Sequence, residues 1–332
     1  MQQIAPRPWV TAGVALAGAS LIAVTPVTAA QLPDIQVPDI QLTAAGDFDP
    51  IGTWESVLQT ASTNATDIWD HFSAAPFPVA QQVLANQIGY LEEFVKDPAS
   101  IANVPTEIFH NLQAAFGAPF EPFLPDNPAD FIYPSLDSTH APWFDIFQQL
   151  IPTLITDENL QPLVLDLLSF SASPASGVLW GSIGTMLSPA LQFGSDVTGI
   201  VDALSSSDPM TALQDLVDMP ANITNAFLNG YGPVDLVPLL AQLGITLPSI
   251  DIFGLDASLT SLPLDFGGLL SPGGSLFDAI GVTASLLGAD LPLFAGDPVG
   301  PIASMVELAQ SIAMDIGWSG SGMPLDILSM LF

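Results

Sequence analysis

The stretch DPIGTWESVLQTASTNATDIWDHF (residues 49–72) indicates how this chain folds. Asp49 offers a side-chain oxygen that can cap a helix, and Pro50 has a φ angle suited to the first helical turn. Behind this start, apolar residues recur every three to four positions: Trp54, Val57, Leu58, Ala61, Ala65, Ile68, Trp69 and Phe72. This period predicts an amphipathic helix. Because Trp54 and Trp69 share its apolar face, we interpret them as core residues rather than as a ligand-stacking pair.

The same start signal, Asp followed by Pro, returns at 97–98, 208–209 and 297–298. A second helix is predicted over 79–94, and the short proline-rich link SAAPFP (73–78) favours antiparallel packing on the first helix. Prolines crowd the stretch 119–142, which we expect to be an irregular loop with its aromatic side chains turned inward. A last helix is expected to start at Asp297-Pro298 and to end at Gly317.

Short alternations of apolar and polar residues, punctuated by Pro and Gly, appear from residue 245 onward and predict short strands or extended loops. The fold class expected is therefore mainly α, a compact amphipathic-helix bundle with an extended N-terminal lead-in and a short-strand region. The boundaries we expect are a signal peptide over 1–30, the Pro-rich lead-in over 31–48, a helical body over 49–244, a strand-and-loop region over 245–295, and a C-terminal helix with an apolar tail over 296–332.

Two segments resemble each other at a constant offset of 115 residues: VPTEIFHNLQAAFG (104–117) and MPANITNAFLNGYG (219–232). Each reads as a proline-initiated helix with one apolar stripe that ends at a glycine in a left-handed cap. An ancestral duplication and convergence on common helix signals both explain this similarity.

The amino terminus has the three parts of a secretory signal peptide. Arg7 precedes an uncharged apolar run over 10–24, and small residues follow, so cleavage is expected after Ala29 or Ala30. An uncleaved amino-terminal anchor is the alternative. Cysteine is absent from the whole chain, so an exported form must gain its stability from burial rather than from disulfides.

Cleavage would leave one lysine against 34 acidic residues, a formal charge of −33. This charge excludes nucleic acid as a direct partner and disfavours anionic lipid surfaces. It admits diffuse divalent cations, although Asp47 and Asp49 are too few for a dedicated calcium site. The longest uncharged stretch, residues 167–195, is only mildly apolar, so we expect a buried hairpin there rather than a membrane span.

Candidate catalytic residues are few. His71, His110 and His140 lie far apart and lack the spacing of an HExxH metal motif, and we expect His71 and His110 to be solvated. Ser319 in GWSGSG departs from the GxSxG nucleophile motif. We therefore expect a protein that is not an enzyme, with no catalytic, cofactor-binding or metal-binding residues assigned.

Several blocks together resemble a family of exported mycobacterial proteins that are commonly labelled outer membrane porins of a gap-junction-like type. They are PRPWVTAGVALAGASLIAVTPVTA, LPDIQVPDIQLTA, TASTNAT with QQVLANQIGYLE, MPANITNAFLNGYG, GGLLSPGGSLF and PIASMVELAQSIAMDIGWSGSG. The resemblance runs nearly end to end and implies a location in the outer envelope, or secretion, and solute passage. It implies no functional residues.

A barrel porin needs many strands of about ten residues, whereas this sequence predicts helices. A pore would then require helices assembled in a homo-oligomer, with an acidic lumen that favours cations. The alternative is a structural or binding protein attached to the outer membrane or the cell wall, and a hydrolase is a weaker alternative.

Overall fold

The computed structural model describes residues 49–126, 129–155, 157–244, 249–252, 255–286 and 289–325. The chain separates into two units, 1–35 and 36–332, and every described residue belongs to the second. The expected signal peptide with Arg7, Ala29 and Ala30, the lead-in over 31–48 and the end of the apolar tail lie outside the described residues.

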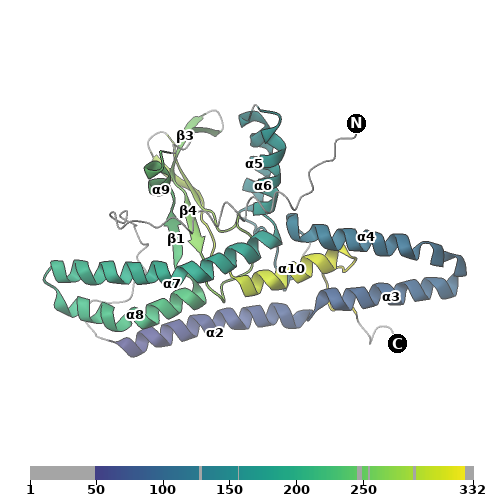
Figure 1. Cartoon of the computed structure of the whole chain (residues 1–332), viewed down its shortest axis with the longest axis horizontal. Helices are drawn as coiled ribbons and strands as arrows, with labels where there is room; N and C mark the ends of the chain where they lie inside the picture. The colour runs from purple at the N-terminus through teal and green to yellow at the C-terminus, as the bar shows by residue number, and fades with distance from the viewer. Residues whose placement is uncertain are drawn as a thin grey trace. The chain divides into compact units, whose positions relative to one another are not determined.

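Helices dominate the described chain, so the expected mainly α fold class is confirmed (Figure 1). The α-helices are α2 (Pro50–Ala74), α3 (Pro78–Lys96), α4 (Val104–Gly117), α5 (Ala141–Leu154), α6 (Leu160–Ser171), α7 (Pro174–Ser205), α8 (Pro209–Asn229), α9 (Val237–Gln242) and α10 (Pro301–Asp315). Two short 3-10 helices, η1 (Pro98–Ala102) and η2 (Ala118–Phe120), flank α4.

The Asp-Pro signals start three of these elements. Asp49 accepts a hydrogen bond from the Gly52 backbone N–H at 2.9 Å to cap α2, and Asp208 caps α8 in the same way. Asp97 caps the 3-10 helix η1 rather than an α-helix. The fourth expectation is wrong, because α10 begins at Pro301, after Gly300, and the Asp297 backbone N–H donates to the Asp278 carbonyl oxygen instead.

The predicted antiparallel pairing of the first two helices is also wrong. α3 continues in the direction of α2 instead of folding back (Figure 1). The link between them is only three residues long and has Phe77 at a φ of 52°, and α2 packs on α8 and α10 instead. This arrangement leaves much of the α2 stripe outside the core: Trp69 is 61% exposed and Trp54 is 38% exposed.

The strands are short and antiparallel. β1 (Gly232–Asp235) pairs with β4 (Pro263–Phe266), and a second sheet has the order β2 (Ser249–Ile252), β3 (Leu255–Ser261), β5 (Val282–Leu286), β6 (Ala289–Phe294). All of them except β1 lie in the region near 245–295 where the sequence predicts strands. Two irregular segments, 267–281 before β5 and 295–300 after β6, pack along α7 and the end of α8.

Glycines on α7 make this close packing possible. Gly177, Gly181 and Gly184 are spaced by four and three residues, so they lie on one helix face. A β-carbon at Gly177 would collide with the carbonyl oxygen of Gly274, and one at Gly181 would lie 2.6 Å from the carbonyl carbon of Gly300. The α7 backbone therefore rests directly on these two irregular segments.

The proline-rich loop supplies core residues, as expected for aromatics turned inward. Phe123, Ile132 and Tyr133 are buried, and Leu136 packs with Phe144 and Phe277 in a separate cluster. The buried clusters among the described residues are small and rich in alanine. Close backbone packing therefore accompanies side-chain burial in this fold.

The two segments that echo each other in sequence take different structures. The first forms all of α4, and Gly117 ends it with a right-handed φ of −82°. In the second, Pro220 lies inside α8 and Gly232 begins β1. The expected left-handed cap is therefore wrong for both segments: Gly117 is right-handed, Gly232 lies in β1, and α8 ends before Gly230, whose φ of 103° and ψ of 161° are extended rather than left-handed helical.

No described helix is by itself long and apolar enough to cross a membrane. α6 and α7 taken together meet the requirement of length and composition, with a bend of 67° between them. The uncharged stretch 167–195, expected as a hairpin, is the end of α6 and most of α7, because Ser173 and Pro174 start a new helix there.

Candidate functional site

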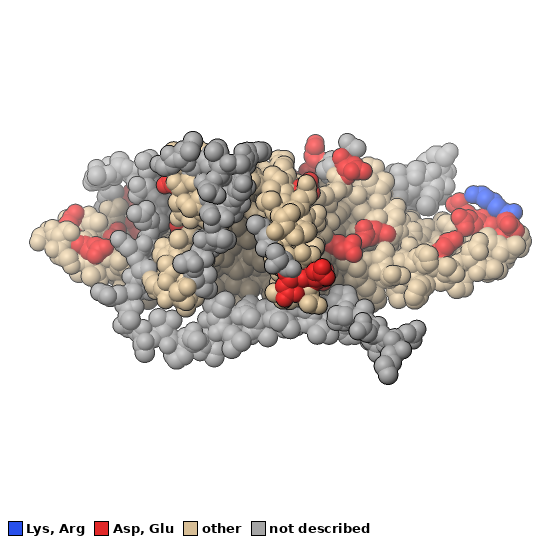
Figure 2. Space-filling model, turned by 90° about the horizontal axis from the view of Figure 1, so that it is seen from above, with Lys and Arg blue, Asp and Glu red and all other residues tan. Residues whose placement is uncertain are grey.

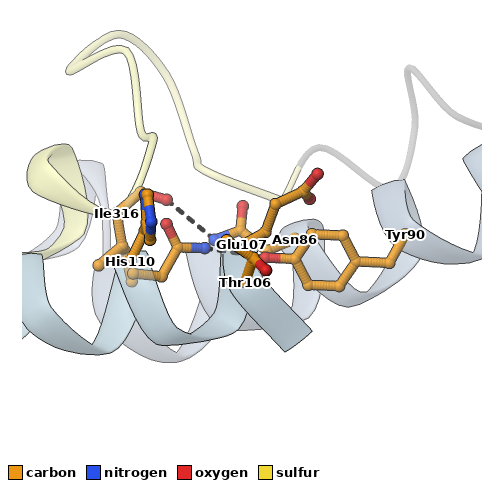
Figure 3. Close-up of a pocket in the computed structure, with 7 residues that line it drawn as sticks. Asn86, Tyr90, Thr106, Glu107, His110 and Ile316 are labelled. Carbon is orange, nitrogen blue, oxygen red and sulfur yellow. Dashed lines mark hydrogen bonds between the residues drawn. The ribbon is translucent and has the colours of Figure 1, made fainter. Parts of the chain in front are cut away.

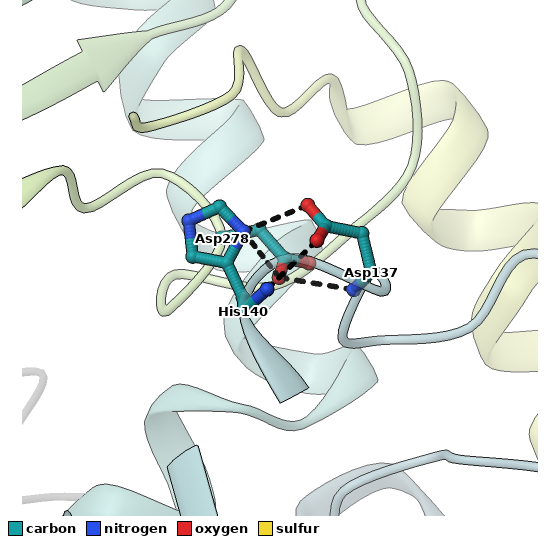
Figure 4. A group of neighbouring side chains, drawn as sticks. All are labelled: Asp137, His140 and Asp278. Atoms are coloured by element: carbon teal, nitrogen blue, oxygen red, sulfur yellow. Dashed lines mark hydrogen bonds and ion pairs between the residues drawn. The ribbon is translucent and has the colours of Figure 1, made fainter. Parts of the chain in front are cut away.

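Two segments that are far apart in the sequence, the turn that carries Asp137 and His140 and the turn that carries Asp278, meet just before α5 (Figure 4). Asp137 accepts hydrogen bonds from the backbone N–H groups of Thr139 and His140, a local turn that precedes the helix. Asp278 lies in a turn of the irregular segment 267–281, where the Ser275 backbone N–H donates a hydrogen bond to its Oδ2 at 3.0 Å. We call these three residues the Asp–His–Asp cluster.

Both ring nitrogens of His140 have partners. Nδ1 lies 2.7 Å from Asp137 Oδ2 and 3.7 Å from Asp278 Oδ1, and Nε2 lies 3.2 Å from the carbonyl oxygen of Ile280. The His140 side chain is fully buried, with the rings of Phe277 and Phe294 edge-on to it. The imidazole is therefore held in one orientation and is shielded from water.

Charge and burial act against each other in this cluster. Burial alone would lower the pKa of His140, but the carboxylates of Asp137 and Asp278 raise it above its ordinary value. Burial raises the pKa of Asp278 to about 7, although the hydrogen bond from the Ser275 N–H and the charge of His140 both act to lower it. Burial would also raise the pKa of Asp137, but hydrogen bonds from His140 and Asp297 bring it below its usual range. The Asp297 carboxyl shares a hydrogen bond with Asp137, and burial together with this bond raises the pKa of Asp297 to about 6.

Two more buried carboxyl groups, those of Glu307 and Asp265, lie near the cluster. Glu307 on α10 is fully buried, and neither of its oxygens has a hydrogen-bond partner of good geometry. Burial, with the charge of Asp278, raises the pKa of Glu307 well above its ordinary value. Burial, with the charge of Asp297, raises the pKa of Asp265 to about 7, and Asp265 Oδ1 is also without a partner.

Basic side chains do not balance these acids. The described chain contains one Lys or Arg, Lys96, which lies on the surface 3.4 Å from Glu92. In Figure 2 the blue basic side chain stands at one end of the molecule, next to red acidic ones. The interior carboxyl groups can therefore be neutralised by protons, by His140 or by a bound cation.

The other two histidines lie outside this cluster. His110 is exposed, as expected, and lines a surface hollow of about 340 Å³ between α3, α4 and the end of α10 (Figure 3). The expectation for His71 is wrong: its side chain is only 14% exposed, Nδ1 lies 2.7 Å from the carbonyl oxygen of Phe131, and the ring stacks on Tyr133 at 3.6 Å. The proline-rich loop folds over α2 and covers it.

The remaining candidates from the sequence take structural roles. Ser319 is exposed, and its Oγ lies 2.9 Å from that of Ser321, with no histidine among its described hydrogen-bond partners. Asp49 caps α2, and Asp47 lies outside the described residues. The spacing of Asp137 and His140, three residues apart, was a signal available in the sequence, but Asp278 lies too far along the chain for spacing to reveal it.

Large apolar side chains are exposed along several helices. On α4 they are Ile108, Phe109, Leu112 and Phe116, spaced so that they form one stripe, which we call the α4 stripe. Val83, Leu84, Leu91, Phe94 and Val95 form a similar stripe on α3, and Met186, Leu187, Phe193, Val197, Val201 and Leu204 form one on α7. Apolar faces of this extent commonly mark contacts with proteins or membranes.

About a third of this chain is similar to part of a known mycobacterial protein. Over 115 residues, which are 34% of this chain, it is 30% identical to the PE-PGRS family protein PE_PGRS62 of Mycobacterium tuberculosis. The match covers 22% of that relative, so the chain spans about a fifth of its length. No protein-family model matches the chain, and no solved structure matches it. The match supports the mycobacterial part of the resemblance, and its name carries no porin label.

Proposed function

We propose that this chain is a non-enzymatic protein of the mycobacterial cell envelope that attaches to an uncharged lipid surface through its apolar helix stripes. The observation that carries this proposal is the exposure of the α4 stripe, where Phe109 is 64% exposed and Phe116 is 74% exposed. Burial of one such side chain contributes about 1.5–3 kcal/mol, so a stripe of four provides a substantial driving force for adsorption.

The negative charge of the chain disfavours attachment to an anionic lipid surface. Anionic headgroups attract basic segments, but the described helices carry Lys96 as their one basic residue. The acidic side chains would instead be repelled by an anionic membrane. An uncharged or zwitterionic lipid surface therefore suits these stripes. On the same grounds of charge we infer that nucleic acid is not a partner.

Vesicle flotation tests this attachment. We expect the purified protein to float with phosphatidylcholine vesicles, and the triple variant Phe109→Ser/Leu112→Ser/Phe116→Ser to partition at least about a hundredfold more weakly. The matched control replaces three exposed polar residues of the same helix, Thr106→Ser/His110→Ser/Gln113→Ser, and should float like the wild type.

Three outcomes would contradict the proposal. They are a wild type that does not float, equal flotation of both triple variants, and a concentration-dependent oligomer in sedimentation experiments that leaves the vesicles unoccupied. The last outcome would assign the stripes to a second copy of the chain.

Solute passage is a second candidate, and the bent α6–α7 pair favours it, because this pair has the length and composition of a broken span or re-entrant loop. Planar-bilayer recordings of the purified protein would then show cation-selective conductance, as an acidic lumen requires. Absence of conductance at every protein concentration would leave surface attachment as the function.

A further inference from the structure

We propose that the Asp–His–Asp cluster is a binding site for a divalent transition-metal cation, with Zn²⁺ as the best fit. Asp137, His140 and Asp278 would each supply one ligand atom. This inference goes beyond the proposed attachment to lipid and does not depend on it.

The geometry of the cluster is the first support. One ligand atom from each of the three residues lies within 4.8 Å of the others. His140 Nδ1 is 2.7 Å from Asp137 Oδ2 and 3.7 Å from Asp278 Oδ1. Ligands at about 2.0–2.2 Å from one ion are separated by roughly 3.0–3.5 Å, so the observed distances bracket the required ones. Small side-chain shifts would complete the site.

Hydrogen bonds from neighbouring groups orient the three candidate ligand side chains. A histidine that binds a metal usually donates its other ring N–H to a carbonyl or carboxylate. Here Nε2 faces the Ile280 carbonyl, and Nδ1 donates to the Asp137 carboxylate. A metal ion would displace the Nδ1 proton and take up the lone pair, which is then directed at the two carboxylates. The Ser275 backbone N–H donates to Asp278 Oδ2 and so orients the Asp278 carboxyl group. A hydrogen bond with the Asp297 carboxyl group orients Asp137 in the same way.

Glu307 provides a second, independent observation. Its side chain is fully buried, neither carboxylate oxygen has a hydrogen-bond partner of good geometry, and the Gly274 N–H gives it only a weak interaction. The charges of Glu307 and Asp278 act on each other. Buried carboxylates are normally paired with a positive group or a metal. The described chain offers no Lys or Arg near them. Without a cation Glu307 keeps a proton, and a divalent cation bound at the cluster would supply the positive charge that allows it to ionise.

The mixed ligand set selects the metal. Imidazole suits Zn²⁺, Cu²⁺ and Ni²⁺, whereas sites built from carboxylate and carbonyl oxygens suit Mg²⁺ and Ca²⁺. One imidazole with two carboxylates matches the three protein ligands of an open tetrahedral zinc site. The Asp137 side chain is 36% exposed, so the fourth position can be reached from solvent on that side.

Calorimetric titration of the metal-free protein with ZnCl₂ tests the site. We expect one tight site per chain above the weak background of surface carboxylates, and no comparable site for Mg²⁺. His140→Gln should weaken this site by more than the roughly 10–100-fold that loss of a supporting residue costs. The matched control, His110→Gln, removes an exposed histidine and should bind like the wild type.

A measurement on the wild type keeps the test valid if His140→Gln fails to fold. Two-bond ¹H–¹⁵N NMR spectra should show His140 changing to the Nε2–H form with Nδ1 bound when one equivalent of Zn²⁺ is added. Three results would overturn the proposal: no tight site, equal affinity in both histidine variants, or an imidazole signal of His140 that Zn²⁺ leaves unchanged.

Discussion

Replacing Gly177 with alanine is expected to destabilise the folded chain by at least about 3 kcal/mol, because overpacking against rigid backbone exceeds the usual cost of an added methyl group. The new β-carbon would overlap the carbonyl oxygen of Gly274 and lie 3.0 Å from Ser304 Oγ. Since Gly274 belongs to the irregular chain that carries Asp278, the overlap would also displace the Asp–His–Asp cluster. Chemical denaturation followed by circular dichroism measures this loss.

Gly194→Ala is the matched control, because Gly194 lies on the same helix and a β-carbon there meets nothing within 4 Å. Alanine has the higher helix propensity, so this variant should be more stable than the wild type by about 0.5–1 kcal/mol. Equal stabilities for the two variants would show that α7 does not rest on the Gly274 segment.

Replacing Glu307 with glutamine is expected to stabilise the protein at pH 8 and to leave it nearly unchanged at pH 4.5. Burial, reinforced by Asp278 and opposed by the Gly274 N–H, raises the pKa of Glu307 well above its ordinary value. The folded chain must therefore keep a proton that the unfolded chain releases. Stability therefore falls as the pH rises above the unfolded pKa of Glu307, and glutamine removes this loss.

The difference between the two proteins should grow by about 1.4 kcal/mol per pH unit until the folded pKa is reached. Urea unfolding from pH 4.5 to pH 8, with a chelator present throughout, measures it. Asp265 contributes a slope of the same sign in both proteins, so comparison at equal pH isolates Glu307. Glu55→Gln, at an exposed position on α2, is the control that should follow the wild type. A constant difference across this range would contradict the prediction.

Local signals in the sequence predicted much of the secondary structure. Asp49 and Asp208 cap helices because an N-cap depends only on the next three residues. The strands over 249–294 and the inward aromatics of the loop likewise follow from short-range patterns of Pro, Gly and apolar residues. Which helix packs on which could not be predicted from these local signals.

The wrong predictions for Trp69 and His71 have a common physical cause. Trp69 lies on the apolar stripe of α2 yet is exposed, because α3 continues α2 instead of covering it. His71 looks solvated in the sequence but is covered by a loop that lies 60 residues further along the chain. Periodicity indicates that a face is apolar, but it does not indicate which segment covers that face.

By itself, the sequence determined the starts of α2 and α8, the mainly α class, and the excess of acid over base, since these depend on residue type and local spacing. Only the tertiary structure decided that Asp278 lies beside His140, 138 positions earlier in the chain, and that Glu307 is buried close to Asp278. The physical reason is that the α7 glycines let the irregular segment approach the helix backbone, and this approach carries remote carboxylates into one interior.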